Sequence, residues 1–446
     1  MRTELFSSIG LYTPSFFRIH LGTNEVMGDI RQMHPDLAAT FFHEYVHYLQ
    51  DLTTTYGLMN INYVVDFIKT VNANQRNSGN RELFIPYQLS PENDGTVFYN
   101  SELQRIYCGT VTNTNARRIN SCQIIQEQVT LLNAENQTYE KTVERVLLIG
   151  TDDKGQRYQY YFGSDAVIES MAYELEQHLY PGITDTPANF PYTACRLLAN
   201  FLLPDFADDP LRVIAVCDVV MMEFNPGLGF YRAIEAIIRD KVDITDPDNI
   251  HKALYTGNSN PFLGFSTTEE LFNYMSTSGA SQLNSYFTTG VFGQNKIWFD
   301  YLFTKAAIIR RTHPNLFLQI ARGGPIATNT AFHAIYGELG QPATTNNDFR
   351  AVYRIYNLDS NNIFPEMTWV INQIFNIYLN SGSSNMCRCN LYNWCRLSCE
   401  HLGIDDYTDD RCWDEPWARV NDAQPCTFAQ VWKSWGMENE IPTPRP

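Results

Sequence analysis

The sequence predicts an α+β fold that is mainly helical. Apolar residues recur with helical spacing over most of residues 187–380. By contrast, short apolar runs separated by Pro, Asn, Gly and Thr occupy residues 80–163. The chain of 446 residues is long enough for two or three domains. We therefore expect a helical framework with a β-containing insertion in its N-terminal part.

The first elements have clear local signals. The run Phe16–Leu21 is typical of a strand and is followed directly by turn residues. A strong helix is expected over residues 36–56, with Pro35 before it and Gly57 as its C-terminal cap. A second helix is expected over residues 60–74.

A β-hairpin and a further helix are expected next. Two apolar runs, at residues 146–150 and 157–162, flank Asp152–Gly155, which has the composition of a tight turn. Residues 165–179 then carry a helical pattern, and Pro181 stops it. The pattern of apolar residues thus changes from that of strands to that of a helix just after the hairpin.

The rest of the chain divides by the same patterns. Further helical segments are expected at residues 210–223, 229–241, 281–322, 347–356 and 366–379. We expect three regions: residues 1–185, which include the insertion at about 80–163; a helical region at 186–380; and a cysteine-rich, acidic tail at 381–446. No internal repeat relates these regions to one another.

Charge and composition exclude several classes of protein. The formal net charge of −17 disfavours nucleic acid and anionic membrane surfaces as partners, because like charges repel. The most apolar run, Val213–Met222, is short and contains Asp218, so no membrane span is expected. The N-terminus lacks the apolar stretch of a secretory signal. We therefore expect a cytoplasmic protein whose 10 cysteines are thiols or metal ligands.

Residues 43–47 read His-Glu-Tyr-Val-His, an HExxH motif within the first strong helix. His43 and His47 are four residues apart, so they project about 40° apart around the helix axis and about 6 Å apart along it. Two imidazoles placed in this way can bind one ion, and zinc accepts such nitrogens at about 2.0–2.1 Å. Glu44 lies about 100° from His43, beside the ion, where its carboxylate can take a proton from a zinc-acidified water. The motif predicts a zinc site with Glu44 as general base.

The neighbours of the motif favour metal binding over a surface helix with two unrelated histidines. Phe41, Phe42, Val46 and Leu49 surround it, so the helix is expected to be largely buried, and buried imidazoles need partners. Chance would produce roughly one HExxH match in a hundred chains of this length and composition.

This helix resembles the one that carries HExxH in the zincin metallopeptidases. The resemblance implies hydrolysis of peptide bonds in a protein or peptide substrate. The metzincin pattern HExxHxxGxxH does not fit, because Gln50 and Thr53 stand where its glycine and third histidine belong. Asp51, four residues after His47, occupies a position that is also acidic in thermolysin-like members and can support the ligands there. A surface role for Asp51 is the alternative.

The third ligand must come from elsewhere, because a catalytic zinc usually takes three protein ligands and one water. Glu169 resembles the ligand glutamate on the second helix of the gluzincins, and Ala172, three positions later, is small enough to allow close helix packing. Glu169 lies at the edge of the expected core stripe, where a buried carboxylate needs a partner such as zinc. Tyr173 stands where many gluzincins have an acidic supporting residue, so it is a candidate for that place.

Two alternatives to Glu169 as ligand remain open. Glu169 can instead be a solvated helix residue, since other glutamates lie nearby. Residues 150–153 partly resemble the aspzincin GTxD motif, which would make Asp153 the ligand, although the same residues also suit a plain hairpin turn.

Two further parts of an active site have weaker signals. The strand at residues 157–162 is a candidate edge along which an extended substrate could add. The candidates for stabilising an oxyanion are Tyr173 and the pair His333 and Tyr336, chosen from 26 tyrosines.

The C-terminal tail holds six of the cysteines. A second, structural zinc site is conceivable for Cys387, Cys389, Cys395 and Cys399, with further donors at Cys412, Cys426 or His401. Their spacing is not that of a standard zinc finger or ribbon. Because Leu391, Trp394 and Leu397 indicate a helix, we favour buried free thiols there and expect a single, catalytic zinc.

The sequence therefore predicts a zinc-dependent metallopeptidase. One alternative is an intracellular effector or toxin-type protease with one dedicated protein target, which the large helical region would suit. Another is an inactive zincin-fold protein that is kept for binding. The presence of Glu44 argues against the inactive form, because a purely structural zinc site does not need a general base.

Overall fold

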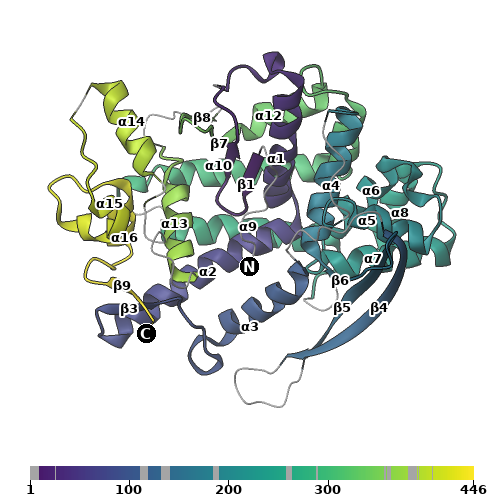
Figure 1. Cartoon of the computed structure of the whole chain (residues 1–446), viewed down its shortest axis with the longest axis horizontal. Helices are drawn as coiled ribbons and strands as arrows, with labels where there is room; N and C mark the ends of the chain where they lie inside the picture. Colours follow the sequence, from purple (N-terminus) through teal and green to yellow (C-terminus); the bar gives the residue numbers. More distant parts are fainter. Residues whose placement is uncertain are drawn as a thin grey trace.

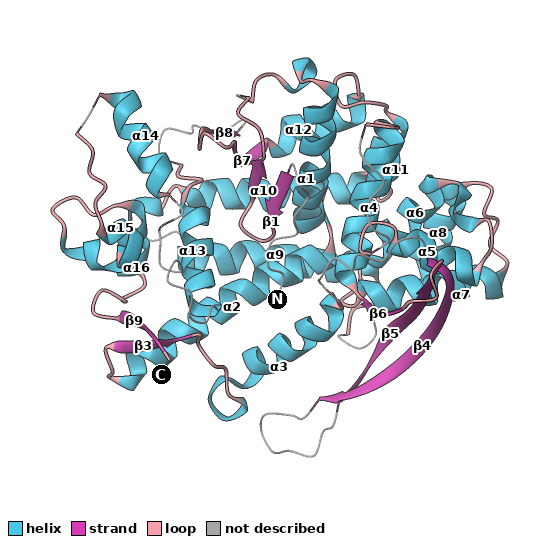
Figure 2. Cartoon of the chain, viewed as in Figure 1, coloured by secondary structure: helices cyan, strands magenta, loops and turns pink. Residues whose placement is uncertain are grey.

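The computed structural model confirms an α+β fold that is mainly helical (Figure 2). Its strands form small, separate sheets among long helices. The structure describes residues 10–25, 27–110, 119–131, 141–183, 190–257, 264–287, 290–355, 358, 363–379, 389, 391–403 and 405–445.

Helices run through the whole of the described chain (Figure 1). The α-helices are α1 (Pro35–Thr53), α2 (Thr55–Ser78), α3 (Pro91–Cys108), α4 (Ser164–Leu179), α5 (Ala194–Leu202), α6 (Pro210–Val220), α7 (Pro226–Asp240), α8 (Pro247–Gly257), α9 (Thr268–Phe287), α10 (Asn295–Thr312), α11 (Leu316–Arg322), α12 (Thr330–Leu339), α13 (Met367–Leu379), α14 (Tyr392–Leu402), α15 (Arg411–Asp414) and α16 (Thr427–Ser434). Short 3-10 helices lie at η1 (Ile30–Gln32), η2 (Phe206–Asp208), η4 (Gly290–Phe292) and η5 (Pro416–Asn421). None of the described helices offers an apolar stretch long enough to cross a bilayer.

The strands form sheets of four, three and two members in the described residues. The strands are β1 (Gly10–Thr13), β2 (Arg18–Leu21), β3 (Glu82–Ile85), β4 (Ile119–Leu131), β5 (Lys141–Asp152), β6 (Arg157–Phe162), β7 (Gln341–Thr345), β8 (Ala351–Arg354) and β9 (Ile441–Pro444). The four-stranded sheet has the order β1-β2-β7-β8, with β1 and β2 antiparallel and β2 and β7 parallel. Thus β1 is an outer strand, and β2 and η1 separate it from α1 along the chain.

The break between α1 and α2 lies earlier than predicted. Thr54 takes extended backbone angles and caps α2, because its Oγ1 accepts a hydrogen bond from the N–H of Gly57 at 3.1 Å. Gly57 therefore belongs to the first turn of α2 and is not the cap of α1. A Cβ on Gly57 would lie 2.4 Å from the Cα of Asp51, so glycine is needed where the two helices meet.

The stretch predicted to be β-rich contains a helix as well as the predicted hairpin. β5 and β6 pair antiparallel on either side of the turn at Asp152–Gly155. α3 was missed because few of its residues are buried, so its apolar period is weak. The β4–β5 hairpin, by contrast, extends away from the helices (Figure 1).

Most of the later helical segments are confirmed, with two corrections. α6, α7 and α13 match their predicted ranges, whereas residues 281–322 divide among α9, α10 and α11. The helix predicted at 347–356 is wrong, because Ala351–Arg354 forms β8 and pairs with β7. Val352 and Tyr353 are good strand formers, and the pairing with β7 overrides the helical spacing.

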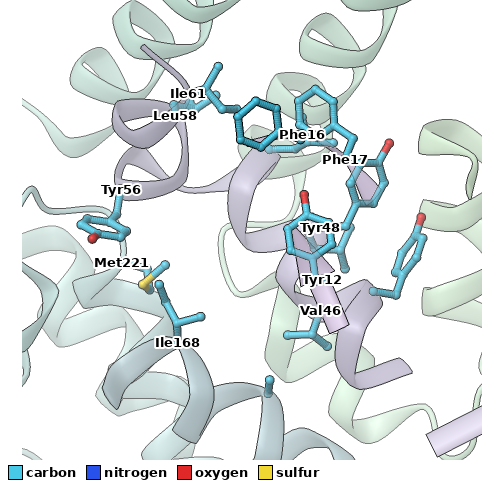
Figure 3. Packing of buried hydrophobic residues seen from close by; sticks show 14 of the residues in the cluster. Tyr12, Phe16, Phe17, Val46, Tyr48, Tyr56, Leu58, Ile61, Ile168 and Met221 are labelled. Carbon is cyan, nitrogen blue, oxygen red and sulfur yellow. The ribbon is translucent and has the colours of Figure 1, made fainter. Parts of the chain in front are cut away.

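A single hydrophobic core includes residues from all three predicted regions, for example Val46, Phe230 and Trp432. Figure 3 shows part of it around α1, where Tyr12 and Phe17 from the β1–β2 hairpin lie next to Tyr48. The boundaries at residues 185 and 380 stay a prediction. The HExxH helix, however, lies within this shared core.

Candidate metal centre

The HExxH motif lies on a helix that is buried on all sides. α1 packs against α2, α4, α10 and the β1–β2 hairpin, and every residue from Ala38 to Thr53 is buried. His43, Glu44 and His47 are exposed by only 5%, 2% and 4%. A solvated surface helix with two unrelated histidines is therefore excluded.

α4 brings Glu169 to the two histidines. Its carboxylate oxygens lie 3.5 Å from Nε2 of His43 and 3.3 Å from Nε2 of His47. Tetrahedral bonds of about 2.0–2.1 Å place two ligand atoms about 3.3–3.4 Å apart. The three ligand atoms, all within 4.8 Å of one another, thus have the spacing that one zinc-sized ion requires. Among the described residues, no other three ligand atoms converge in this way.

The acidic residues of α4 are buried rather than solvated. Glu169 is 1% exposed, and Glu174 on the same helix is buried in an ion pair with Arg196. The residues of the predicted core stripe are all buried: Ile168, Ala172, Leu175 and Leu179. Small Ala172 lies one turn after Glu169, where α4 packs against α1.

The outer nitrogen of each histidine is held by an acceptor. Nδ1 of His43 lies 2.8 Å from a carboxylate oxygen of Glu176, and Nδ1 of His47 lies 2.8 Å from Oε1 of Gln50. The amide nitrogen of Gln50 donates in turn to the carbonyl of Ile168 at 3.1 Å. Because these oxygens accept, Nδ1 donates in both rings, which leaves Nε2 as the nitrogen that faces Glu169 and can bind an ion.

Neither of these supporting residues was predicted, although signals for both exist. Glu176 follows Glu169 by seven residues, which is about two helical turns, so the two carboxylates share a face of α4. Gln50 follows His47 by three residues on α1. Glu176 provides the acidic support for which Tyr173 stood as the candidate.

The centre gathers negative charge in a buried place. Glu44, Glu169 and Glu176 are all buried beside the two imidazoles. Burial by itself lowers the pKa of His43, but the hydrogen bonds to Glu169 and Glu176 and the charge of Glu44 outweigh it and raise that pKa well above its ordinary value. Three carboxylates that strengthen a positive charge in this way form a site suited to a cation.

Glu44 lies against the outer strand β1. A Cβ placed on Gly10 would be 2.7 Å from Oε1 of Glu44 and 2.7 Å from Cγ2 of Thr40. Only a glycine allows strand and helix to approach so closely at this point. The general-base candidate therefore faces a strand that, in the described residues, pairs with β2 alone.

Tyr192 is a site residue that the sequence did not reveal. Its ring centroid lies 6.4 Å from that of His43, and its side chain is half-buried. Burial raises the pKa of Tyr192, and the charges of Glu169, Glu44 and Glu176 raise it further. Its phenol therefore stays protonated and can donate a hydrogen bond. No spacing rule links Tyr192 to the motif, because it lies in a turn before α5 and not on α1 or α4.

Asp51 and Tyr173 lie near the centre but make other contacts. Asp51 accepts hydrogen bonds from the Tyr12 hydroxyl at 2.8 Å and the Ser15 backbone N–H at 2.6 Å, so it ties the β1–β2 hairpin to α1. The Tyr12 ring is stacked at 6.3 Å from His47. Tyr173 is half-buried and lies 6.1 Å from Tyr192, and burial raises its pKa to about 12.

The rival ligand Asp153 lies elsewhere. It is exposed in the β5–β6 turn and is not among the described ligand atoms that converge. Its neighbour Asp152 accepts hydrogen bonds from the N–H groups of Lys154 and Gln156 at 2.9 and 2.8 Å. These contacts are those of a hairpin turn, which was the simpler interpretation of residues 150–153.

Two further candidates have structural partners. His333 approaches the carbonyl of Ala327 at 3.2 Å, and Tyr336 donates to Gln341 at 2.7 Å. Both belong to α12, which packs on the Tyr45 side of α1, away from the two histidines. Neither side chain is placed to stabilise an oxyanion at the centre.

The β6 edge, predicted as a substrate-binding edge, is already occupied in part. The N–H of Thr110 donates to the carbonyl of Tyr161, and the N–H of Tyr161 donates to Oγ1 of Thr110, both at 2.9 Å. Thr110, which follows α3, therefore covers part of this strand.

Of the cysteines proposed for a second site, Cys389, Cys395 and Cys399 are buried. Cys387 lies outside the described residues. The predicted helix in the tail is confirmed as α14.

No protein-family model, curated protein or solved structure matches this chain. The geometry of the described residues is therefore the basis for inferring its function.

Proposed function

We propose that this chain is a zinc-dependent peptidase of the zincin type, gluzincin-like, acting on a protein or peptide substrate. The observation that carries the proposal is the convergence of His43, His47 and Glu169 from two packed helices, with Glu44 beside them. A clip that held zinc only for structure would use a fourth protein ligand and would not need Glu44.

The donor set fits zinc. Two imidazole nitrogens and one carboxylate oxygen form one of the ligand sets of catalytic zinc sites, and three protein ligands leave a position for water or substrate. When bound, the ion supplies Lewis acidity and lowers the pKa of a water in its shell. Glu176 and Gln50 keep the rings oriented so that their Nε2 atoms face the position of the ion.

Glu44 serves as the general base in this proposal. Its carboxylate accepts the proton of the attacking water and later delivers it to the leaving amine. Because Glu44 is buried against Gly10, its Oε1 is held in place and shielded from bulk water. This burial favours proton transfer over exchange with solvent.

Tyr192 is the donor that we assign to the substrate oxygen. The phenol lies next to His43, and its raised pKa keeps it protonated. A hydrogen bond to the carbonyl oxygen would strengthen as negative charge develops there in the transition state. This role replaces the oxyanion candidates Tyr173, His333 and Tyr336.

β1 is the edge that we assign to the substrate. It is the outer strand of its sheet in the described residues, and Gly10 at its start lies beside Glu44. An extended peptide that paired with β1 would therefore pass the general base with its backbone fixed.

The test combines metal analysis with mapping of cleavage. Elemental analysis should find zinc in the wild type and in Glu44→Gln, and one equivalent less in His43→Ala. New protein N-termini should appear in a lysate treated with wild type and not in one treated with Glu44→Gln. Zinc in both proteins without new N-termini from either would favour an inactive binding protein. A single cleaved protein would favour a protease with one dedicated target.

A further inference from the structure

The C-terminal tail brings four cysteines to one place. A cavity of about 10 Å³ is lined by Cys389, Cys395, Cys412 and Cys426, with Arg419 and Tyr407 beside them. The four come from separate positions: three residues before the start of α14, within α14, within α15 and at the N-cap of α16. A cavity of that size holds a single water or ion at most.

The hydrogen bonds around the cavity bring the segments that carry these sulfurs together and place one cation beside them. The N–H of Cys389 donates to the carbonyl of Cys412 at 2.8 Å, which places these two cysteines side by side. The buried Arg419 guanidinium donates to Sγ of Cys412 at 3.1 Å. Burial raises the pKa of Cys426, but backbone N–H groups of Ala429 and Phe428 and the charge of Arg419 oppose that rise.

Cys389 has a similar environment. Burial raises the pKa of its thiol, while a backbone hydrogen bond from Leu391 opposes the rise. The charges that Cys395, Cys412 and Cys426 would carry raise it further, so the four sulfurs lie close enough to repel one another as thiolates. Four sulfurs around one small buried cavity have the arrangement in which cysteines bind a single metal ion.

We propose that Cys389, Cys395, Cys412 and Cys426 form a structural zinc site, separate from the site at His43. Each thiol gives its proton to solvent and its sulfur lone pair to Zn²⁺, so that binding releases four protons. Four thiolates give the ion a net charge of −2, and Arg419 next to Cys412 offsets part of it. With four protein ligands the shell is closed, which is typical of a structural site.

This ligand set differs from the one weighed on spacing alone. Cys399 is buried one turn after Cys395 on α14 but does not line the cavity, and Cys412 and Cys426 do. No three of these sulfurs lie within 4.8 Å of one another, as the ligand atoms at His43 do, so the segments would draw together when the ion binds. Zn–S bonds of about 2.3 Å require that movement.

Such an ion would fix the tail to the rest of the molecule. α16 packs on α13 through Trp432 and Tyr378, and β9 pairs with β3. α14 and α15 have few comparable anchors, and both contribute sulfurs to the cavity. The zinc would therefore link two loosely anchored helices to one that is docked.

Cobalt substitution tests the proposal on the full-length wild type. Cobalt bound to several thiolates shows a sulfur-to-metal charge-transfer absorption, which a His/His/Glu site cannot produce. We expect this absorption in wild type and undiminished in His43→Ala, so the outcome is independent of the function proposed above. A cobalt-loaded wild type without it would overturn the proposal, and no variant has to fold for that result.

Zinc counts of variants identify the ligands. We expect two zinc per chain in wild type and in Cys399→Ser, and one in Cys412→Ser and in Cys426→Ser. Cys399→Ser is the matched control, because its thiol is buried on the same helix as Cys395 but does not line the cavity. Loss of zinc from Cys399→Ser with retention in Cys412→Ser would refute this ligand set.

Discussion

Two buried clusters of acidic and basic side chains lie where helices cross, and they differ in their balance of charge. In one, Arg310 of α10 donates to Asp218 of α6 at 2.6 Å, and His251 of α8 lies 3.4 Å from the other carboxylate oxygen. In the other, Glu169 and Glu176 of α4 meet two histidines of α1. Only the first contains a permanent cation.

The difference separates a structural cluster from a functional one. Burial alone would raise the pKa of Asp218, but Arg310 and His251 outweigh it and hold that pKa below its ordinary value. The carboxylate is thus neutralised within the protein. At the metal centre the partners of Glu169 and Glu176 are imidazoles, which are neutral when Nε2 binds an ion. Burial of titratable groups is common to both clusters, and only the uncompensated charge points to a ligand.

The largest effect is expected from Glu169→Ala. Removing this ligand takes away a charge and opens the shell, so zinc at the α1–α4 centre should be lost and hydrolysis should fall at least about 10³-fold. Glu174→Ala is the matched control, because it removes a buried carboxylate of the same helix that pairs with Arg196 instead. Zinc content and cleavage rate measure both. Equal zinc loss in the two variants would mean that α4 is merely destabilised.

Arg310→Met should affect the other cluster alone. It leaves Asp218 buried without its cation, so the free energy of unfolding should fall by about 3–5 kcal/mol, while zinc content stays the same. Arg311→Met, at an exposed neighbouring position, should change stability little. Chemical denaturation measures the difference. If Arg310→Met lost zinc while remaining folded, the separation between the two clusters would be wrong.

Tyr192→Phe should lower kcat and leave the zinc content unchanged. Loss of one donor to a developing oxyanion typically costs about 10²–10³ in kcat. KM and zinc content should stay close to wild type, because the ring remains beside His43. Tyr173→Phe removes the neighbouring hydroxyl and should have little effect. If Tyr173→Phe lowered kcat and Tyr192→Phe did not, the oxyanion donor would be Tyr173, the candidate predicted from the sequence.

The parts of the centre set by local geometry could be predicted from the sequence. His43, Glu44 and His47 lie on one helix, so their spacing alone fixes their relative positions. Glu169 needed a resemblance as well, because the distance between α1 and α4 depends on packing. Glu176 had a readable spacing from Glu169, but an acidic residue four positions after the ligand was expected and Tyr173 stands there.

Residues that only tertiary folding brings to the centre could not be predicted, because no sequence spacing links them to the motif. Tyr192 and Gly10 reach the centre from segments with no fixed spacing to the motif, and the tail sulfurs come from four segments. In the fold, β8 and the start of α2 were misread for the same reason. Strand pairing with β7 and the close contact at Gly57 decided those elements, and neither is a local property.

Substitutions of Glu176 should have the smallest effect, but they test most selectively how the metal centre differs from the cluster at Asp218. Its carboxylate touches no ion; it holds Nδ1 of His43 at 2.8 Å and so orients the ring. Glu176→Ala should weaken zinc affinity by about 10–100-fold, the usual effect of losing such support.

Glu176→Gln keeps an acceptor for the Nδ1 proton and removes the charge, so the two variants separate orientation from electrostatics. Zinc affinity measured by competition with a chelator should be largely rescued in Glu176→Gln if orientation dominates. If Glu176→Gln is as weak as Glu176→Ala, the negative charge of Glu176 is what the ion requires, and the charge imbalance that distinguishes this cluster from the one at Asp218 extends to Glu176. Wild-type affinity in both variants would show instead that Glu176 has no part in holding the metal.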